Sequence, residues 1–380
     1  MTRKIFLVTE RRADYTHLRP IIKEISKSKK LDYFLTVTGS HLLKEHGKTI
    51  NEIKNDGFKI SAIFSIFRKT KKDSGTEMTR AFGRSVIQLS NLIEKFKPDL
   101  ILTGFDIGAN FAAAIVGAHT NIVVGHIEGG EVTGTIDESI RHALSKFAHL
   151  HFTSSSDATN RLKKMGENPK YIFTVGNPAL DGIKNIISVN KIELSKKYNI
   201  DLTKKFIIVL QHTVTSEIDS TGQNFLKTIQ AVKEIDIPSI VIFGNNDAGS
   251  KQISKLIKNS KIKQYTNVPY ADYINLLKHA SALVGNSSSG ITEAPFLHTP
   301  TINIGTRQAG RLRSKSIIDV KYNKNEIKNA IVKATENKRF LKKIETQKQL
   351  YGDGNTSKRI IKILESIDLK NFPIQKQITY

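Results

Sequence analysis

A carboxylate that could act as an acid or a base stands at the end of a hydrophobic run in the middle of the chain. Glu128 follows His126 and Ile127 and precedes two glycines, which allow the backbone to bend sharply. Serine or asparagine would fill a purely structural role there more naturally than glutamate. Because polar groups at the carboxyl ends of strands form the ligand sites of open α/β sheets, we predict that Glu128 is catalytic.

A helical pattern with four ionisable side chains follows the glycines. Thr135 and Glu138 have the spacing of a capping box, so Glu138 has a structural role available. Asp137 lies in the first turn, where the helix dipole stabilises a carboxylate by roughly 0.3–1 kcal/mol, and a simple dipole partner is its alternative role. Arg141 and His142 lie one turn beyond Asp137 and Glu138, so each acid can pair along the helix.

A serine-rich turn in the second half of the chain could bind phosphate. It combines the end of a hydrophobic run, the hydroxyls of Ser287 and Ser288, Gly290, and a helical pattern that contains Glu293. The free N–H groups of a helix N-terminus bind anions, and Glu293 could accept hydrogen bonds from ribose hydroxyls. An ordinary capped helix is the alternative. The sequence contains no Gly-Lys-Ser or Gly-Lys-Thr of a Walker loop here.

Further polar side chains follow other candidate strands. Arg307 lies in a loop punctuated by glycines, which suits recognition of phosphate or uracil. His212 lies in a polar turn, and Arg12 and Asp14 follow the first candidate strand, where helix capping is the alternative role of Asp14. Asn245 completes the residues that we predict to bind substrate.

Hydrophobic runs alternate with helical patterns along the whole chain. Helical patterns include residues 17–27 and 79–96, and residues 65–75 are expected to form a mobile loop. Such alternation predicts parallel sheets with helices on both faces. The candidate strands are residues 5–9, 33–38, 100–104, 122–127, 151–154 and 171–176, followed by 206–211, 239–243, 282–285 and 301–304.

We therefore predict an α/β fold of two doubly wound, Rossmann-like domains that face a cleft, as in the glycosyltransferase-B architecture. A chain of 380 residues exceeds what one hydrophobic core usually serves. We expect an N-terminal domain at residues 1–178, an interdomain connection at 179–204, a C-terminal domain at 205–364 and a tail at 365–380.

The composition is that of a globular protein with a basic surface. Fifty-nine Lys and Arg residues against 35 Asp and Glu residues give a formal net charge of +24. Nucleic-acid binding is one interpretation of this excess. The lysines lie in amphipathic stretches without a dense basic arm, so we predict no nucleic-acid partner. The charge would still steer an anionic nucleotide toward the protein.

Several classes of protein are excluded by what the sequence lacks. No apolar run approaches the length of a membrane span, and the first residues do not resemble a signal peptide. The chain has no cysteine, which rules out disulfides and thiolate metal sites, and its histidines lack metal-ligand spacing. We expect a cytoplasmic protein with no membrane partner and no metal site.

The polar segments occur in the same order in a known enzyme family. From residue 12 to residue 355 the chain resembles the hydrolysing UDP-N-acetylglucosamine 2-epimerases, most specifically around Glu128 and Arg307. The resemblance implies that UDP leaves C1 of the sugar while a base removes the C2 proton. Water then adds at C1 as an acid reprotonates C2 from the other face. Such chemistry needs acid/base groups on both sides of the sugar.

The resemblance also implies roles for particular residues. It places acid/base chemistry on carboxylates with Arg141 and His142 beside them, and UDP binding in the C-terminal domain. The implied carboxylates are Asp106, Glu128 and Asp137, and the implied UDP-binding residues are His212, Ser287, Ser288, Glu293 and Arg307.

Three positions depart from the family pattern. Ile107 stands where the family usually has arginine, His17 where it has lysine, and Thr213 where it has proline. The first two changes lie near the sugar and suggest a different sugar substituent or reduced activity, whereas the residues for UDP are retained.

We therefore expect a homo-oligomeric enzyme, dimeric or tetrameric, that needs no cofactor. It would convert UDP-N-acetylglucosamine, or a derivative such as UDP-N,N'-diacetylbacillosamine, to UDP and the free 2-epimerised sugar for sialic or legionaminic acid biosynthesis. A glycosyltransferase of the same fold is one alternative. A non-catalytic protein that binds nucleotide sugars or nucleic acid is the other.

Overall fold

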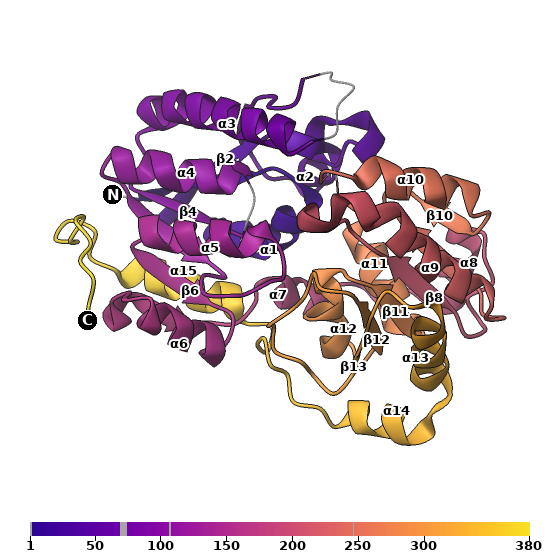
Figure 1. Cartoon of the computed structure of the whole chain (residues 1–380). Coiled ribbons are helices and arrows are strands. Elements are labelled where there is room, and N and C mark those ends of the chain that lie inside the picture. Colours follow the sequence, from indigo (N-terminus) through magenta and orange to yellow (C-terminus); the bar gives the residue numbers. More distant parts are fainter. Residues whose placement is uncertain (1, 69–73, 106–107, 246) are drawn as a thin grey trace. The chain divides into compact units, whose positions relative to one another are not determined.

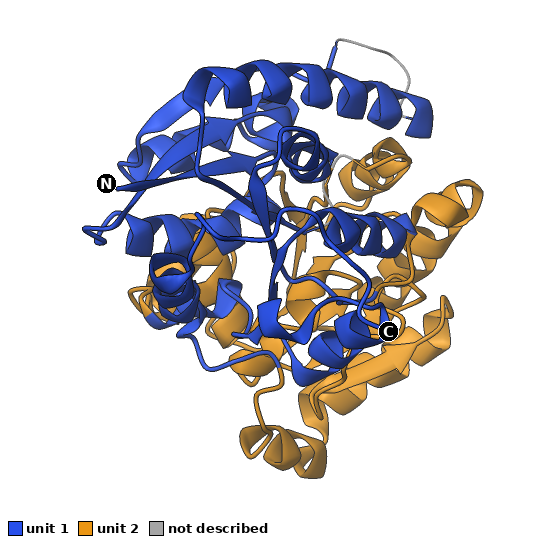
Figure 2. Ribbon diagram, turned by 90° about the vertical axis from the view of Figure 1, so that its left-hand side faces the viewer, with its two compact units in different colours: residues 1–132, 136–184, 351–380 blue, residues 133–135, 185–350 orange. Residues whose placement is uncertain are grey.

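The chain folds into two compact units in a computed structural model that describes residues 2–68, 74–105, 108–245 and 247–380. Unit 1 comprises Met1–Val132, Ile136–Lys184 and Tyr351–Tyr380, and unit 2 comprises Thr133–Thr135 and Asn185–Leu350. Figure 1 labels the helices and strands, and Figure 2 colours the two units. The chain passes from unit 1 to unit 2 inside the predicted connection at 179–204.

Unit 1 is built on a seven-stranded parallel sheet with the strand order β3-β2-β1-β4-β5-β6-β7. This order reverses direction between β1 and β4, which is the usual place for a ligand in a doubly wound sheet. The strands are β1 (Arg3–Thr9), β2 (Leu31–Val37), β3 (Ile60–Ile63), β4 (Leu100–Gly104), β5 (Val123–Ile127), β6 (Leu150–Thr153) and β7 (Ile172–Thr174).

Helices cover both faces of this sheet because side chains alternate along each strand. In β1, Ile5 and Leu7 join the core beneath α1 and α15, whereas Phe6 and Val8 join the core beneath α3, α4 and α5. The helices are α1 (Arg12–Ile25), α2 (Ile50–Asn55), α3 (Gly75–Phe96), α4 (Gly108–His119), α5 (Ile136–Phe147), α6 (Ser156–Lys164), α7 (Ala179–Lys184) and α15 (Thr356–Ser366), with short 3₁₀ turns at Gly39–Leu42, Lys44–His46 and Pro169–Tyr171.

Unit 2 repeats the pattern on a six-stranded parallel sheet with the order β10-β9-β8-β11-β12-β13. Its direction reverses between β8 and β11. Ile207 and Val209 of β8 face the core beneath α9, α10 and α13, and Ile208 faces the core beneath α8 and α11. The strands are β8 (Ile207–Leu210), β9 (Ser239–Ile242), β10 (Lys263–Tyr265), β11 (Ala282–Gly285), β12 (Thr301–Ile304) and β13 (Ile317–Val320).

The helical segments of unit 2 vary in length. The α-helices are α8 (Lys191–Tyr198), α9 (Thr221–Lys233), α10 (Ser250–Asn259), α11 (Tyr270–His279), α12 (Glu293–Phe296), α13 (Lys324–Glu336) and α14 (Lys338–Glu345), and the 3₁₀ turns are η4 (Thr215–Ser220) and η5 (Ser288–Gly290). Among the described residues, no helix combines the length and apolar character that crossing a bilayer requires.

The predicted α/β fold with two doubly wound sheets is confirmed. All ten predicted strands are present, but β3, β10 and β13 were not predicted. These three lie at sheet edges and are mostly half-buried, so they lack the continuous apolar run of a central strand such as β4. The loop predicted at 65–75 includes residues 69–73, which lie outside the described residues.

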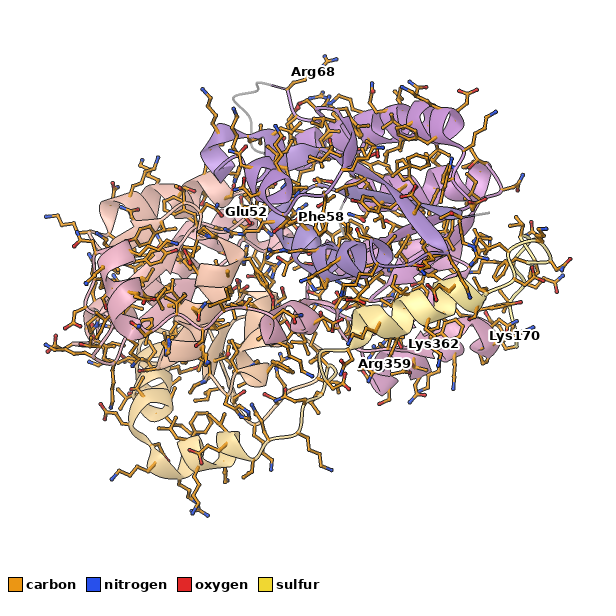
Figure 3. All side chains as sticks on the ribbon, turned by 180° about the vertical axis from the view of Figure 1, so that it is seen from behind. Glu52, Phe58, Arg68, Lys170, Arg359 and Lys362 are labelled. Carbon is orange, nitrogen blue, oxygen red and sulfur yellow. The ribbon has the colours of Figure 1, made fainter. Side chains whose placement is uncertain are left out.

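The C-terminal segment is assigned differently from the prediction, which placed residues up to 364 in the second domain. Residues 351–380 belong to unit 1 instead. The reason is packing, because Ile360 and Leu364 of α15 are fully buried in the same core as α1. Arg359, labelled in Figure 3, also donates to the carbonyl of Val175 (3.0 Å) in unit 1.

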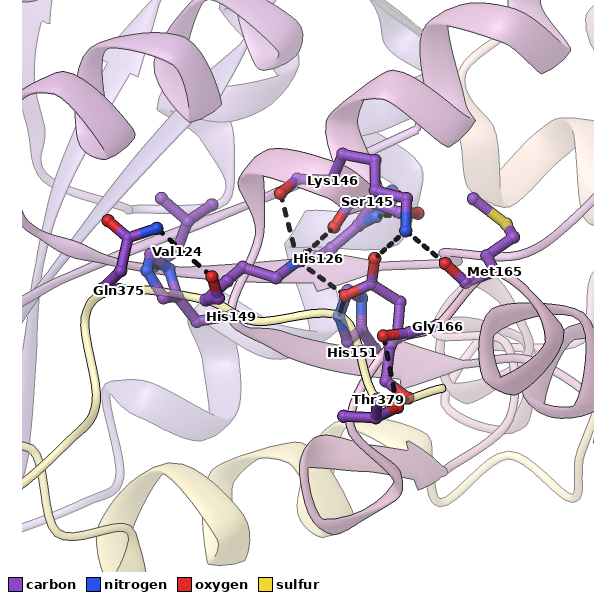
Figure 4. Close-up of polar contacts among 12 residues, drawn as sticks. Val124, His126, Ser145, Lys146, His149, His151, Met165, Gly166, Gln375 and Thr379 are labelled. Carbon is purple, nitrogen blue, oxygen red and sulfur yellow. Dashed lines mark hydrogen bonds and ion pairs between the residues drawn. The ribbon is translucent and has the colours of Figure 1, made fainter.

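The last residues contact unit 1 through a cluster of polar groups around the buried Glu167. Lys376 Nζ donates to Glu167 Oε2 (2.6 Å) and to the carbonyls of Ser145 (2.9 Å) and Lys146 (3.1 Å) near the end of α5. His151 lies on the other side of Glu167, with Nε2 at 3.0 Å from Oε2. We call the contacts of Lys376 with Glu167 and α5 the C-terminal latch. Figure 4 shows the polar contacts in this region, with Ser145, Lys146 and His151 labelled.

Electrostatics in the C-terminal latch favour a charged Glu167. Burial would raise the pKa of Glu167, but hydrogen bonds from His151 and Lys376 outweigh burial and lower it to about 2. Burial also lowers the pKa of His151, although its hydrogen bond with Glu167 acts in the opposite direction.

Candidate active site

The predicted catalytic residue Glu128 lies at the carboxyl edge of the unit 1 sheet. Glu128 follows β5 directly, is 7% exposed and has a φ of +62°. Its N–H donates to the carbonyl of Phe152 (2.8 Å), which fixes the backbone there. A left-handed conformation costs a residue other than glycine about 1–3 kcal/mol, and such strain is concentrated at functional sites. Glu128, the predicted catalytic carboxylate, thus lies at a strained and buried position directly after β5.

Glu131, by contrast, makes hydrogen bonds that hold two loops together. Its Oε1 accepts hydrogen bonds from the hydroxyls of Ser154 and Ser155 (3.1 Å for Ser155) at the start of α6. It is 5% exposed and ties the β5–α5 loop to the β6–α6 turn.

Two side chains from distant parts of the sequence contact the carboxylate of Glu128. Asn177 Nδ2 donates to Oε1 (2.5 Å), and His17 Nε2 lies 3.1 Å from the same oxygen. Asn177 was not singled out from the sequence, where it follows β7 in a Gly-Asn-Pro segment that has the composition of an ordinary turn. His17, noted above as a departure from the family pattern, is thus a direct neighbour of the main predicted catalyst.

The remaining predicted catalytic residues lie on α5 or outside the described residues. The helix begins at Ile136, immediately after Thr135, and Asp137 and Glu138 lie in its first turn. His142 Nε2 lies 3.8 Å from Glu138 Oε1, which confirms that predicted pair. Arg141 is buried, with 2% of its surface exposed, and burial lowers the pKa of His142. Asp106 lies outside the described residues, as does Ile107.

Asp14 has the capping role that was its alternative. Its Oδ1 accepts from the hydroxyl of Thr9 (3.0 Å) and the N–H of Arg11 (2.9 Å), and its Oδ2 accepts from the N–H of Glu10 (2.7 Å) and from Asn110 Nδ2 (3.1 Å). With 1% exposure, Asp14 holds the start of α1 against α4. Direct substrate binding by Asp14 is not favoured by this geometry.

Arg12 is the first residue of α1 and lies near the same sheet edge. Glu10, which the sequence analysis did not select, lies at this edge as well, with Oε1 at 3.6 Å from NH2 of Arg11. The carboxylate of Glu10 is buried and accepts the N–H of Ala109 (2.8 Å) in the first turn of α4. Glu10 could have been identified as a candidate site residue from the sequence, because it is an acid directly after β1, where the strand order reverses.

In unit 2 the corresponding sheet edge is organised by Asn286. Its Oδ1 accepts the N–H of His212 (2.7 Å), and its Nδ2 donates to the carbonyl of His212 (3.0 Å). Asn286 follows β11 and His212 follows β8, so this side chain joins the two strands at the reversal point. Asn286 was another residue that the sequence analysis did not select.

His212 has a defined tautomer. Its Nδ1 accepts the N–H of Asn245 (3.3 Å), so a neutral ring carries its proton on Nε2 and presents a donor. Gly244 permits this approach, because a Cβ there would lie 2.9 Å from Nδ1 of His212. Asn245 therefore acts through its backbone on the predicted substrate-binding histidine.

The serine-rich turn differs from the expected helix. A 3₁₀ turn at Ser288–Gly290 is followed by α12, which has only four residues and starts at Glu293. Pro295 explains the interruption, because its ring has no N–H and clashes with the carbonyl four residues earlier in a longer helix. The strong helix-dipole site expected for phosphate is therefore not formed, and Ser287 and Ser288 offer hydroxyls and local N–H groups instead.

The loop with Arg307 is tied to the same edge. Arg307 NH1 (3.2 Å) and Gln308 Nε2 (2.8 Å) both donate to the carbonyl of Asn286. The loop starts at Gly305, whose φ of +76° and close approach to the ring of Tyr322 leave no space for a Cβ. Glu293 is 7% exposed and receives a hydrogen bond from Thr292. His212, Arg307 and the serines are thus brought together on one unit.

Metal chemistry has no candidate within the part of the chain that the structure describes, where no group of three or more His, Asp or Glu side chains could hold a metal ion. The described groups are suited to proton transfer in unit 1 and to binding an anionic nucleotide in unit 2.

Comparisons with known proteins point to one enzyme family. The family model described as UDP-N-acetylglucosamine 2-epimerase matches residues 23–365. The chain is 35% identical to the UDP-N,N'-diacetylbacillosamine 2-epimerase (hydrolyzing) of Legionella pneumophila, with 100% of both chains covered. It is 33% identical to the UDP-N-acetylglucosamine 2-epimerase of Neisseria meningitidis, over 99% of this chain and 98% of that protein.

Solved structures show the same fold. The UDP-GlcNAc 2-epimerase from Neisseria meningitidis bound to UDP-GlcNAc superposes with a TM-score of 0.80 at 21% identity, covering 97% of this chain and 100% of that one. The UDP-GlcNAc 2-epimerase of Methanocaldococcus jannaschii in complex with UDP-GlcNAc and UDP gives a TM-score of 0.78 at 23% identity, covering 96% and 99%.

Proposed function

Since the chain belongs to the UDP-N-acetylglucosamine 2-epimerase family, we propose that it is a hydrolysing 2-epimerase acting on UDP-N-acetylglucosamine or UDP-N,N'-diacetylbacillosamine. The observation that carries the proposal is the strained, buried carboxylate of Glu128 with its two polar partners. A carboxylate held in this way is suited to exchange a proton with the sugar.

The proposed reaction proceeds by elimination and rehydration. The C1–O bond to UDP breaks with its electron pair leaving on UDP, while a base takes the C2 proton and the C2–H electrons form the C1=C2 bond. Water then adds its oxygen to C1, and C2 receives a proton on the opposite face. The products are UDP and the free 2-epimerised N-acetyl sugar.

Unit 1 would supply the acid/base groups for this reaction. We assign acid/base roles to Asp106, Glu128 and Asp137, with Arg141 and His142 beside them. The two faces of the sugar need one proton-accepting and one proton-donating group, which is why more than one carboxylate is required.

Unit 2 would bind UDP. His212 presents an Nε2–H donor, the serine-rich turn presents hydroxyls and Arg307 presents a guanidinium, all of which suit phosphate oxygens. Glu293 is assigned to the ribose hydroxyls, and the remaining residues of the predicted substrate-binding set that belong to unit 2 are Asn245 and Gly290.

Two sugar nucleotides are candidates for the substrate. Relatives at 35% and 33% identity are named for the bacillosamine derivative and for UDP-N-acetylglucosamine, respectively. The replacement of family residues by Ile107 and His17 favours a modified sugar, and hence legionaminic rather than sialic acid biosynthesis. The cytoplasmic location and the homo-oligomeric state stay predictions.

An experiment in deuterated water tests the reaction and the substrate together. The protein is incubated separately with UDP-N-acetylglucosamine and with UDP-N,N'-diacetylbacillosamine, and the products are followed by NMR. We expect release of UDP and a free sugar with inverted configuration and deuterium at C2, from the bacillosamine derivative in particular. Release of UDP without deuterium at C2 would contradict the mechanism and favour a glycosyltransferase-type cleavage.

A further inference from the structure

His17 is held in one orientation by three contacts. Its Nδ1 lies 2.8 Å from the carbonyl of Ala13 in the preceding turn of α1. Its ring packs against Phe105, with 4.9 Å between the ring centroids. Its Nε2 lies 3.1 Å from Glu128 Oε1, and the two side chains are 15% and 10% exposed. The imidazole therefore spans the space between α1 and the end of β5.

These contacts determine where the protons of the ring lie. A carbonyl oxygen only accepts hydrogen bonds, so Nδ1 must carry a hydrogen. Nε2 then faces a carboxyl oxygen, and that contact is favourable only if one proton lies between the two atoms. Either His17 is an imidazolium beside a carboxylate, or a protonated Glu128 donates to a neutral ring.

Asn177 favours the first of these states. Its Oδ1 accepts the N–H of Ala179 (2.9 Å), which orients the amide so that Nδ2 donates to Glu128. The main chain of Asn177 is fixed as well, because its N–H donates to the carbonyl of Tyr351 (2.7 Å). A second donor on Oε1 stabilises negative charge on that oxygen, which places the shared proton on His17.

We propose that His17 is a positioning residue that forms a proton-sharing pair with Glu128. The pair always retains one proton between Nε2 and Oε1, and a second proton on the Glu128 carboxyl group is the one exchanged with C2 of the sugar. If Glu128 is the base, the pair goes from one proton to two as it accepts the C2 proton. If Glu128 is the acid, the pair goes from two protons to one as it protonates C2, and another carboxylate serves the opposite face of the sugar in either case. The inference rests on the proposed function and assigns a role to a side chain that differs from the family pattern.

The first test compares two substitutions of the same residue. His17→Lys keeps a cation beside Oε1, whereas His17→Gln keeps a hydrogen-bond donor but cannot hold the proton. We expect His17→Gln to lower kcat by about 100-fold, within the range of general acid–base effects, with KM and the affinity for UDP within twofold of the wild type. His17→Lys should restore kcat to within about tenfold of the wild type.

Two outcomes would overturn the proposal. One is a His17→Gln enzyme with the kcat of the wild type. The other is an equal loss of kcat and of thermal stability in both variants, which is the result expected of a packing role alone.

A spectroscopic test does not depend on activity or on the folding of variants at position 17. In ¹⁵N NMR of the histidine-labelled protein at pH 7, we expect both ring nitrogens of His17 to be protonated. In Glu128→Gln, Nδ1 should stay protonated and Nε2 should lose its proton. A wild-type ring with an unprotonated Nδ1 would refute the pair. If the wild-type protein releases no UDP from either sugar nucleotide, the proposed function fails, whereas this spectrum still decides the proton arrangement.

Discussion

Replacing Lys376 by methionine tests whether the C-terminal latch stabilises unit 1 through the charge of Glu167. The substitution keeps the length of the aliphatic chain but removes the donor to Glu167 Oε2 and to two carbonyls at the end of α5. Glu167 is 2% exposed, so solvent replaces the missing donor poorly. The variant should therefore leave a buried carboxylate with less compensation.

The magnitude follows from the pKa of Glu167. A fall from 4.5 to about 2 corresponds to about 3 kcal/mol of stabilisation at neutral pH, at 1.36 kcal/mol for each pKa unit. His151 and Lys146 remain as partners, with Lys146 Nζ at 3.0 Å from Oε1. Because His151 accounts for the larger part of the pKa shift and Lys376 for the rest, we expect the free energy of unfolding to fall by about 1–2 kcal/mol, or Tm by about 2–8 °C.

The dependence on pH provides the sharper test. A carboxylate with a lowered pKa contributes its full stability above pH 4.5 and loses it as the pH falls toward 2. The difference between wild type and Lys376→Met should thus be largest at pH 7 and shrink between about pH 5 and pH 3. Urea unfolding followed by circular dichroism at several pH values measures it, with Lys370→Met, at an exposed position in the same segment, as the control.

Two results would refute this reasoning. Equal stability of Lys376→Met and Lys370→Met at pH 7 would show that the latch contributes little. A loss of stability that stays constant from pH 7 to pH 3 would show that Lys376 acts by packing and not by charge.

Three further predictions concern the two sheet edges. Glu128→Gln should lower kcat by about 10²–10⁴-fold without changing the affinity for UDP in calorimetry, and a retained kcat would remove Glu128 from the mechanism. Asn286→Ala removes the side chain that satisfies the main-chain N–H and carbonyl of His212, so it should weaken UDP binding by about tenfold. The rate of C2 exchange per bound substrate should persist. Unchanged UDP binding would contradict the role of Asn286. Burial lowers the pKa of His41 to about 4 despite nearby Asp14, so the folded protein binds a proton at this ring less readily than the unfolded chain does. The contribution of His41 to the free energy of unfolding is therefore complete above pH 6.5 and declines as the pH falls toward 4. His41→Gln should therefore flatten the stability profile by about 2 kcal/mol between pH 7 and pH 5 in urea unfolding, and parallel profiles would exclude His41 as a source of acid sensitivity.

The fold could be predicted where burial leaves a strong pattern. Central strands such as β4 and β11 are buried on both faces and appear in the sequence as continuous apolar runs. The edge strands β3, β10 and β13 contact a neighbour on one side only and include exposed or half-buried polar residues. Their positions depend on pairing with a distant strand, which a local pattern does not contain.

The candidate site shows a similar division. Glu128 could be predicted because an acid after a hydrophobic strand and before glycines is unusual locally. Asn177 and Asn286 could not, because an asparagine after a strand is an ordinary turn residue until its partners are known. The interruption near α12 was foreseeable from Pro295, whereas the capping partners of Asp14 come from α4 and from the turn after β1.

The return of residues 351–380 to unit 1 has a consequence for the order of folding during synthesis. Apart from Thr133–Thr135, unit 2 is one continuous segment, Asn185–Leu350, inserted between two parts of unit 1. Its sheet can therefore be completed while the ribosome is still adding α15 and Lys376, whereas the core beneath α1 lacks Ile360 and Leu364 until α15 has been synthesised. The unit that starts first along the chain is thus finished last, and a nascent chain stalled before residue 356 would carry a folded unit 2 and an uncovered face on the sheet of unit 1.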